Sequence, residues 1–251
     1  MEIGEYAKMA RLQDRHWWFV AKRRLASAML ARHANVPEPA RSLEIGAGTG
    51  AMVPVLQRYG PVVGLDYFAP ALEFLREALP VNGDAQRLPF ADSSFDLVGC
   101  FDLLYHRNIE QVDRALAEIF RVLRPRGYIL ITDSACPALY GRHDASHHGA
   151  RRFSRARLLT ELTAAGLTPV HVSYFHMAVF PVVAATRIGG RWLNSALGRK
   201  APEAGQSQLA EASSLANTVF GALYRVEAPL AARFRLPFGV SIVAIARRGD
   251  S

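Results

Sequence analysis

Hydrophobic residues follow two patterns that alternate along the chain: short continuous apolar runs, and apolar residues spaced three to four positions apart. The spacing of three and four is typical of a helix with one buried face, and it is clearest between Ile109 and Leu123. The apolar runs predict strands at 42–45, 61–66, near 81, and at 95–101, 128–132, 169–174 and 238–246. The helical spacing predicts helices at 5–34, 51–58, 70–79, 109–123, 155–165 and 217–234.

The strands alternate with helices, which predicts a mostly parallel sheet covered by helices on both faces. About 60 residues without a convincing strand precede the last strand. We therefore expect residues 176–236 to be a helical insertion that covers the acceptor, with a mobile loop at 194–214. The core is predicted to comprise residues 35–175 together with 237–251, and residues 1–34 an N-terminal helical segment.

Composition narrows the class of protein. The chain has 251 residues, 50% of them hydrophobic and 21% charged, which is typical of a globular protein. No run reaches the roughly 18 apolar residues that a bilayer span needs, and the first residues lack the apolar core of a signal peptide. Two cysteines, Cys100 and Cys136, are too few for a disulfide framework. These features predict a cytoplasmic protein.

The net charge of +8 is distributed unevenly along the chain. Residues 1–34 carry +4, residues 35–134 carry −4 and residues 135–251 carry +8. The basic flanks fit solvated surfaces, an anionic substrate or a membrane surface. They do not form the basic, aromatic-rich stripe on the central scaffold that nucleic-acid binding favours.

A glycine-rich turn at 43–50, LEIGAGTG, lies where the first strand gives way to a helix. Glycines at such a turn allow a ligand to approach the backbone closely, and the helix start offers free N–H groups. Asp66 ends the next strand, 20 residues after Gly46, where a carboxylate accepts hydrogen bonds from ribose hydroxyls. Because Gly46, Gly48 and Ala51 also fit the dinucleotide pattern, the turn alone predicts either NAD(P) or another nucleoside.

Three further segments narrow this choice. Asn82–Ala85 follows the third strand, Ser94–Val98 opens the fourth, and Arg121–Gly127 closes the long helix. With these segments in this order, residues 40–135 resemble the class I S-adenosylmethionine-dependent methyltransferases, in particular the type 11 branch. The resemblance implies a Rossmann-like, doubly wound, seven-stranded sheet whose last strand is antiparallel, and S-adenosylmethionine as the cofactor.

The resemblance also implies a set of cofactor-binding residues at the strand ends. Those around the methionine moiety are Glu44, Gly46, Ala47, Gly48 and Phe101. Those around the ribose and the adenine are Asp66, Tyr67, Asp84 and Ala85. Arg126 stands where the family usually has a glycine, so we expect a local change of the backbone there without loss of activity.

The flanking segments 16–24, 147–154 and 237–241 are similar to motifs of methyltransferases that act on cell-surface glycans or lipid-linked substrates. This similarity implies a small-molecule or lipid- or glycan-linked acceptor and contact between the acceptor and Trp18. It also leaves open a peripheral contact with the inner face of a membrane. The alternative for Trp17 and Trp18 is simple packing of the first helix on the core.

Methyl transfer is an in-line displacement that depends mainly on positioning, and it needs a base only when the acceptor carries a proton. His106, after the fourth strand, is the first candidate for that base, and His147 and His148 are the second. Arg151 and Arg152 are candidates to clamp an anionic acceptor. Alternatively, backbone groups satisfy His106, and one of the arginines pairs with a nearby acid.

Other chemistries fit the sequence less well. Cys136 is followed by a proline, as in cytosine C5-methyltransferases, but no matching cysteine follows the fourth strand, and the signature of base-amino methyltransferases is absent. Nucleic acid is therefore not the expected acceptor. No metal site is expected from the histidines at 143, 147 and 148. The sequence predicts methyl transfer to oxygen or nitrogen, and the alternatives are an NAD(P)-dependent oxidoreductase and an inactive methyltransferase-like binding subunit.

Overall fold

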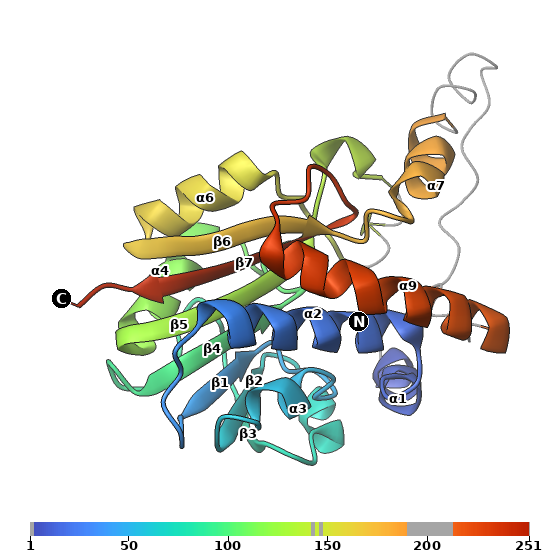
Figure 1. The fold of residues 1–251 in the computed structure, drawn as a ribbon. Helices are drawn as coiled ribbons and strands as arrows, with labels where there is room; N and C mark the ends of the chain where they lie inside the picture. The colour runs from blue at the N-terminus through green and yellow to red at the C-terminus, as the bar shows by residue number, and fades with distance from the viewer. Residues whose placement is uncertain (1–2, 142–143, 146–147, 190–212, 251) are drawn as a thin grey trace.

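The computed structural model describes residues 3–141, 144–145, 148–189 and 213–250. These residues form one seven-stranded sheet with helices on both faces (Figure 1). The strands are β1 (Ser42–Ile45), β2 (Val62–Asp66), β3 (Leu79–Asn82), β4 (Phe95–Phe101), β5 (Leu123–Ser134), β6 (Leu167–Phe175) and β7 (Ser241–Arg248). The helices are α1 (Ile3–Leu12), α2 (Trp17–His33), α3 (Val53–Leu56), α4 (Val112–Val122), α6 (Arg155–Ala164), α7 (Phe180–Ala184) and α9 (Ser214–Arg233). Shorter turns are the 3₁₀ helices η1 (Ala69–Phe74) and η2 (Pro137–Leu139) and the π-helical turn η3 (Ala185–Gly189).

The strand order is β3-β2-β1-β4-β5-β7-β6. Strands β1 to β5 pair in parallel, and β7 lies antiparallel between β5 and β6. Ser241, the first residue of β7, pairs with Ser134 of β5 and Phe175 of β6. The carboxyl ends of β4, β5 and β6 and the start of β7 therefore meet at one edge of the sheet. The predicted Rossmann-like, doubly wound sheet with an antiparallel last strand is confirmed.

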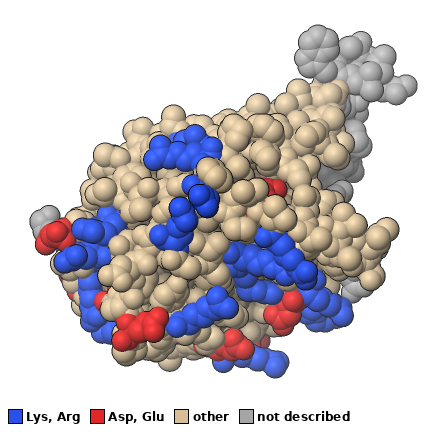
Figure 2. Space-filling view, in the orientation of Figure 1, with Lys and Arg blue, Asp and Glu red and all other residues tan. Residues whose placement is uncertain are grey.

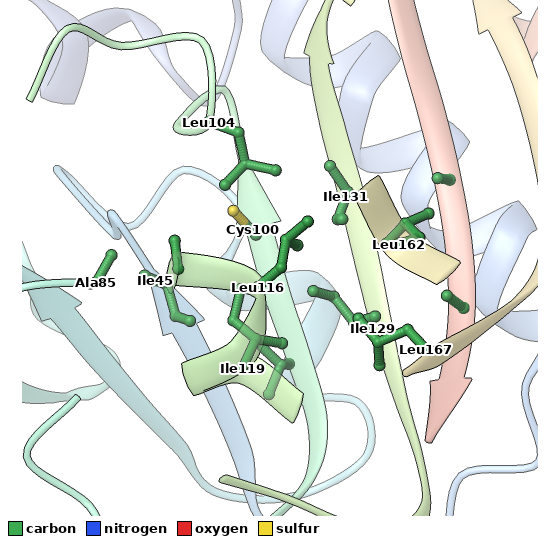
Figure 3. Close-up of a cluster of buried hydrophobic side chains, with 14 of the residues drawn as sticks. Ile45, Ala85, Cys100, Leu104, Leu116, Ile119, Ile129, Ile131, Leu162 and Leu167 are labelled. Atoms are coloured by element: carbon green, nitrogen blue, oxygen red, sulfur yellow. The ribbon is translucent and has the colours of Figure 1, made fainter. Parts of the chain in front are cut away.

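One hydrophobic core lies between the sheet and helices α4 and α6. Ile45, Cys100 and Ile131 from the strands pack with Leu116 of α4 and Leu162 of α6 (Figure 3). All seven residues of β4 are buried, which explains why its sequence is an almost unbroken apolar run.

The second core covers the opposite face and is formed by α2, α3 and α9. Helices α2 and α9 run side by side across the sheet, although they lie about 200 residues apart in the chain (Figure 1). Along α2, Phe19, Leu25 and Met29 are buried, and so is Lys22. A charged side chain thus lies on the apolar face of this helix.

Three predicted helices differ from the structure. The single helix expected at 5–34 is divided into α1 and α2, and His16 caps α2 by accepting a hydrogen bond from the Trp18 N–H at Nδ1. The helix expected at 70–79 is only the 3₁₀ turn η1, since Leu75 is already extended and Leu79 pairs with β2. The helix expected at 51–58 contracts to α3. Most of the loop predicted at 194–214 lies outside the described residues.

No helix within the described part of the chain is long and apolar enough to cross a membrane.

Candidate functional site

The glycine turn between β1 and α3 has the backbone conformation that its sequence predicts. Gly46 and Gly48 have φ angles of +72° and +52°, in the region that favours glycine. A Cβ added to Gly46 would lie 3.0 Å from the Leu103 side chain, and one added to Gly48 would lie 3.7 Å from the ring of Tyr6. The turn is thus closely covered by side chains from the loop after β4 and from α1.

Asp66, at the end of β2, lies against this turn. Its Oδ2 accepts a hydrogen bond of 2.9 Å from the Gly48 N–H, and its Oδ1 accepts one of 2.9 Å from the Phe68 N–H. Burial raises the pKa of the Asp66 carboxyl, and the backbone hydrogen bonds oppose that shift. The carboxylate is therefore fixed in orientation, and each oxygen has a further lone pair for a ligand hydroxyl.

Glu44 lies in β1, directly before the turn, and is buried. Its Oε2 has no hydrogen-bond partner among the residues that the structure describes. Burial, with a further contribution from the charge of Asp66, raises the pKa of Glu44 well above its usual range. A buried carboxyl oxygen without a partner is costly unless a ligand satisfies it, and the ammonium group of a methionine moiety fits that requirement.

The residues predicted for the adenine side lie at the ends of β2 and β3. The Asn82 side chain joins these ends by donating hydrogen bonds to the Asp66 and Tyr67 carbonyls, at 2.9 and 3.0 Å. Asp84 stabilises the next turn by accepting a hydrogen bond of 2.9 Å from the Gln86 N–H. Ala85 is buried, whereas the Tyr67 side chain is 68% exposed and able to stack on a bound ring.

Phe101 and Ala47 are buried at the end of β4 and in the glycine turn. Both belong to the core on the α2 side of the sheet. The Phe101 ring covers Gly99, where a Cβ would lie 2.5 Å from the ring. The Phe101 ring therefore packs on Gly99 of β4, next to the predicted methionine subsite.

Helix α1 covers the glycine turn, which the sequence did not predict. The Tyr6 ring stacks on Phe68 with 5.4 Å between centroids, and burial and the charge of Asp66 raise the Tyr6 pKa to about 12. Thr49 donates its hydroxyl hydrogen bond to Gln13 Oε1, just beyond α1. A cavity of about 480 Å³ lies between α1, the turn at Thr49 and Leu75. Only helical spacing marked this segment in the sequence, and that spacing does not say what the helix covers.

Two of the predicted catalytic histidines come together. The rings of His106 and His148 lie 5.6 Å apart, and His106 Nδ1 accepts a hydrogen bond of 3.2 Å from the Asn108 N–H. Burial, followed by the nearby His148 and Arg107, lowers the pKa of His106 to about 4. The imidazole is therefore neutral at physiological pH. His147 lies outside the described residues, and the catalytic role of all three histidines stays a prediction.

The two predicted acceptor arginines have internal partners. Arg151 donates hydrogen bonds to the carbonyls of Leu104 and Ile109, at 3.1 and 2.6 Å. Arg152 is buried and pairs with Asp144 through Nη2, at 2.6 Å from Oδ1. An anionic acceptor would have to compete with these contacts. This arrangement is the paired alternative that the sequence left open for one of the two arginines.

A group of charged and aromatic side chains that the sequence analysis missed lies at the edge of the sheet. We call it the edge cluster, and it consists of Lys22 and Trp18 of α2, Asp102 after β4, Asp133 of β5 and His176 after β6. Lys22 forms an ion pair with Asp102, and its Nζ lies 4.9 Å from the centroid of the Trp18 ring. The Trp18 and His176 rings stack with 4.0 Å between centroids. The predicted acceptor residue Trp18 thus lies in this cluster.

Burial dominates the electrostatics of the edge cluster. It lowers the pKa of Lys22 to about 7, although the charge of Asp133 opposes the shift, and it raises the pKa of Asp133 to about 7. Two features of the sequence could have identified three of these residues, Lys22, Asp102 and Asp133. Lys22 falls on the apolar stripe of its helix, and Asp102 and Asp133 directly follow predicted strands. No such signal marks His176.

Among the described residues, no group of histidine, cysteine and acidic side chains has the arrangement of a metal site.

Comparisons with known proteins agree with the sheet and the glycine turn. Residues 43–131 match the family model described as a methyltransferase domain. The chain is 40% identical over 118 residues to malonyl-(acyl-carrier protein) O-methyltransferase of Methylococcus capsulatus, covering 42% of each chain. It is 34% identical over 138 residues to demethylmenaquinone methyltransferase of Lactiplantibacillus plantarum, covering 49% of this chain and 53% of that protein. The chain thus spans about half the length of the curated relatives it matches.

Comparison with a solved structure shows structural similarity over most of the chain. Geranyl diphosphate C-methyltransferase from Streptomyces coelicolor A3(2) superposes with a TM-score of 0.55 over 88% of this chain and 77% of that one. The sequence identity is 16%, so this likeness concerns the fold alone. The superposition covers more of the chain than residues 43–131, which the family model matches.

Proposed function

We propose that the protein transfers a methyl group from S-adenosylmethionine to a small-molecule or a lipid- or glycan-linked acceptor, since residues 43–131 match the family model described as a methyltransferase domain. The observation that carries the proposal is the buried Glu44 Oε2 without a described partner, directly before a glycine turn whose backbone is held by Asp66. These groups fit the ammonium and ribose ends of one ligand.

The chain's own residues would bind and orient that ligand. S-adenosylmethionine supplies an activated methyl group on a sulfonium. Glu44 accepts hydrogen bonds from the ammonium, and Asp66 accepts them from the ribose hydroxyls. Asp84 is placed to accept from the adenine amino group, and Tyr6 of α1 excludes water from the turn. Exclusion of water and fixed orientation are the main sources of acceleration for a displacement of this kind.

The acceptor side is proposed from the flanking segments. The matched relatives are named for a quinone precursor and an acyl-carrier-protein substrate, but residues 1–34 and 176–236 lie outside the segment that the family model matches. We place the acceptor beneath the insertion 176–236, of which α7 and α9 are described, against Trp18 and the His106–His148 pair. Oxygen or nitrogen is the proposed methylated atom, and nucleic acid is not a proposed acceptor.

Calorimetric titration tests the cofactor assignment. We expect S-adenosylmethionine and S-adenosylhomocysteine to bind in the micromolar range and NADH not to bind. Glu44→Gln and Asp66→Asn should each weaken binding at least tenfold, because each replaces a carboxyl group at a buried ligand contact. Glu161→Gln, in the exposed pair with Arg157 on α6, is the matched control and should bind like the wild type.

NADH binding without S-adenosylhomocysteine binding would overturn the proposal in favour of a dinucleotide oxidoreductase. If S-adenosylhomocysteine binds but no acceptor in a broad screen is methylated, the inactive binding subunit becomes the better description.

Peripheral contact with an anionic membrane is the second part of the proposal. Along α9, large apolar side chains recur on one exposed face, namely Leu215, Val219, Leu223, Val226 and Leu230. A groove of about 580 Å³ beside this helix is lined by four arginines, namely Arg23, Arg24, Arg58 and Arg225. Figure 2 shows basic side chains gathered directly below the largely uncharged surface of α9. Apolar side chains beside cations fit a bilayer surface with anionic headgroups.

Co-sedimentation with vesicles tests this contact. We expect binding to vesicles that contain phosphatidylglycerol and weaker binding to pure phosphatidylcholine, and the double variant Leu223→Ser/Val226→Ser should lose most of it. Val170→Ser, an exposed apolar position on β6, is the control. Equal binding of both variants and wild type would exclude the α9 face as the contact surface.

A further inference from the structure

The edge cluster lies where the carboxyl ends of three strands converge. Asp102 directly follows β4, Asp133 is the penultimate residue of β5, and His176 directly follows β6. Ser241, at the start of β7, lies 3.1 Å from His176 Nδ1 through its Oγ. His176 is fully buried, and its Nε2 has no partner in the described part of the chain. Ligands of open α/β sheets bind outside this edge of the strands.

The cluster also borders the proposed cofactor turn. Leu103, the residue after Asp102, covers Gly46, since its Cδ1 lies 3.0 Å from where a Cβ on Gly46 would be. Arg23, the residue after Lys22, donates a hydrogen bond of 3.2 Å to the Ala51 carbonyl at the end of the turn. Both partners of the Lys22–Asp102 pair are thus one residue away from a contact with the turn.

The two members of the ion pair differ in exposure. The Lys22 side chain is 5% exposed, whereas that of Asp102 is 36% exposed. The carboxylate therefore faces solvent and the amine lies behind it. Asp102 and His176 have positive φ angles of 52° and 61°, and backbone of this kind in non-glycine residues concentrates at functional sites.

Lys22 is one of few lysines in a chain whose basic residues are mostly arginines. The sequence contains 27 arginines and three lysines, Lys8, Lys22 and Lys200. Arginine forms ion pairs at least as well as lysine but does not release its proton in proteins. A buried lysine does release its proton, because burial disfavours the ammonium. The one described cation on the apolar face of α2 is thus a group that is able to exchange a proton.

We propose that Asp102 and Lys22 remove the proton of the methyl acceptor, with Asp102 as the catalytic residue that contacts the acceptor and Lys22 as the positioning residue that takes the proton from it. This inference rests on the proposed function. The acceptor's O–H or N–H proton passes to the Asp102 carboxylate and on to the neutral amine of Lys22. The freed lone pair forms the new bond to the methyl carbon, the carbon–sulfur bond breaks, and its electron pair stays on sulfur. Lys22 then holds an ammonium paired with Asp102, and it loses that proton to solvent through Asp102.

The groups that face Lys22 are consistent with this exchange. Asp102 faces it from the end of β4 and Asp133 from β5, and the charge of Asp133 favours the ammonium without restoring the usual lysine pKa. His176 faces it from the end of β6, where burial and then Lys22 lower its pKa well below the usual range and keep it neutral. Behind His176, α9 contributes Tyr224 and Glu227, and burial raises the pKa of both side chains.

The first test measures the protonation of Lys22 directly. With only three lysines, selective labelling with ¹³Cε and ¹⁵Nζ gives three side-chain NMR signals, and Lys22→Arg assigns one by its loss. We expect the Lys22 signal to titrate near neutral pH, well below the usual lysine value of about 10.4. A Lys22 signal that titrates near that usual value would overturn the proposal, whatever the activity of the protein.

The second test separates proton removal from a structural role. Lys22→Arg retains the charge opposite Asp102 but is unable to accept a proton, and Lys8→Arg, on α1, is the matched control. On a hydroxyl or amine acceptor, we expect Lys22→Arg to lower turnover at least 100-fold and to remove the rise of kcat with pH around neutrality. In the reverse reaction of S-adenosylhomocysteine with iodomethane, iodide leaves without any proton transfer, and Lys22→Arg should match the wild type within about twofold.

Two results would overturn the inference. Turnover of Lys22→Arg at the wild-type rate on the protonated acceptor would show that no proton reaches Lys22. Equal losses in both reactions would assign Lys22 to structure alone. If S-adenosylhomocysteine does not bind the wild type, that result contradicts the proposed function instead. The NMR titration would still show whether Lys22 is protonated at neutral pH.

Discussion

The half of the sheet around β1, β2 and β3 and the half around β5, β6 and β7 form their sites by different means. The first uses backbone, because Gly46 and Gly48 have positive φ and Asp66 is held by two backbone N–H groups. The second, together with the adjacent end of β4, uses side-chain ion pairs, because the buried Lys22 pairs with the partly exposed Asp102 and Arg152 pairs with Asp144. A site made of backbone leaves a local sequence pattern. A site made of side chains from distant elements leaves isolated residues that only the fold brings together.

The largest effect is expected from breaking a buried ion pair in the second half. Arg152→Met should lower the free energy of unfolding by about 3 kcal/mol, because Asp144 loses its main partner and the Ala135 carbonyl loses a hydrogen-bond donor. Urea denaturation measures this change. Arg157→Met, which breaks the more exposed pair with Glu161, should cost below about 0.5 kcal/mol. Equal losses in the two variants would contradict the dependence of this half on buried charges.

Lys22 should give the stability of the protein a characteristic pH dependence. Its folded pKa of about 7 lies below the unfolded value of about 10.4, so the folded state binds fewer protons than the unfolded state between these values. Stability should therefore rise with pH from 7 towards 10, by an amount on the order of 3 kcal/mol. Urea denaturation at successive pH values measures the rise, which Lys22→Met should abolish and Lys8→Met should preserve. A flat wild-type profile in this range would contradict the burial of a titrating lysine.

Ligand binding in the first half should be sensitive to substitutions that change the backbone conformation of the glycine turn. Gly46→Val should weaken S-adenosylhomocysteine binding at least 100-fold in calorimetry, because a β-branched residue is a severe outlier at φ +72° and its side chain meets Leu103. Gly221→Ala, in α9 with no atom within 4 Å of the added Cβ, should bind like the wild type and gain up to about 1 kcal/mol of stability. Retained binding in Gly46→Val would show that the turn does not approach the ligand.

The fold could be predicted where burial determines the sequence. Strands at 42–45 and 95–101 are predicted with their observed bounds, and every residue in both strands is buried, the polar Glu44 and Asp96 included. The division between α1 and α2 could not be predicted, since residues 5–34 contain no proline or glycine. It is fixed by tertiary contacts, such as the Trp17 N–H donating to the Asn217 side chain 200 residues away.

The candidate site divides in the same way. The sequence places the turn with Gly46 and Gly48 after the first predicted strand and Asp66 at the end of the second, and in the structure the Gly48 N–H donates a hydrogen bond to Asp66. Tyr6 and His176 were missed because each reaches the site from a segment whose own sequence shows only a helix or a strand end. The cofactor side is thus visible in local sequence patterns, whereas the acceptor side is formed by residues that only the fold brings together.

The smallest effect is expected at Arg126, near the start of β5. The sequence predicts a local change of the backbone at Arg126, and Arg126 has a φ of +66°, in the left-handed region that favours glycine. The side chain is largely exposed and lies 3.5 Å from the exposed Asp250, a contact that contributes little. Arg126→Gly should therefore raise the free energy of unfolding by up to about 1 kcal/mol through relief of the left-handed conformation, as measured by urea denaturation, and leave S-adenosylhomocysteine binding unchanged. A loss of stability would mean that the Arg126 side chain stabilises the start of β5 by more than its backbone conformation costs.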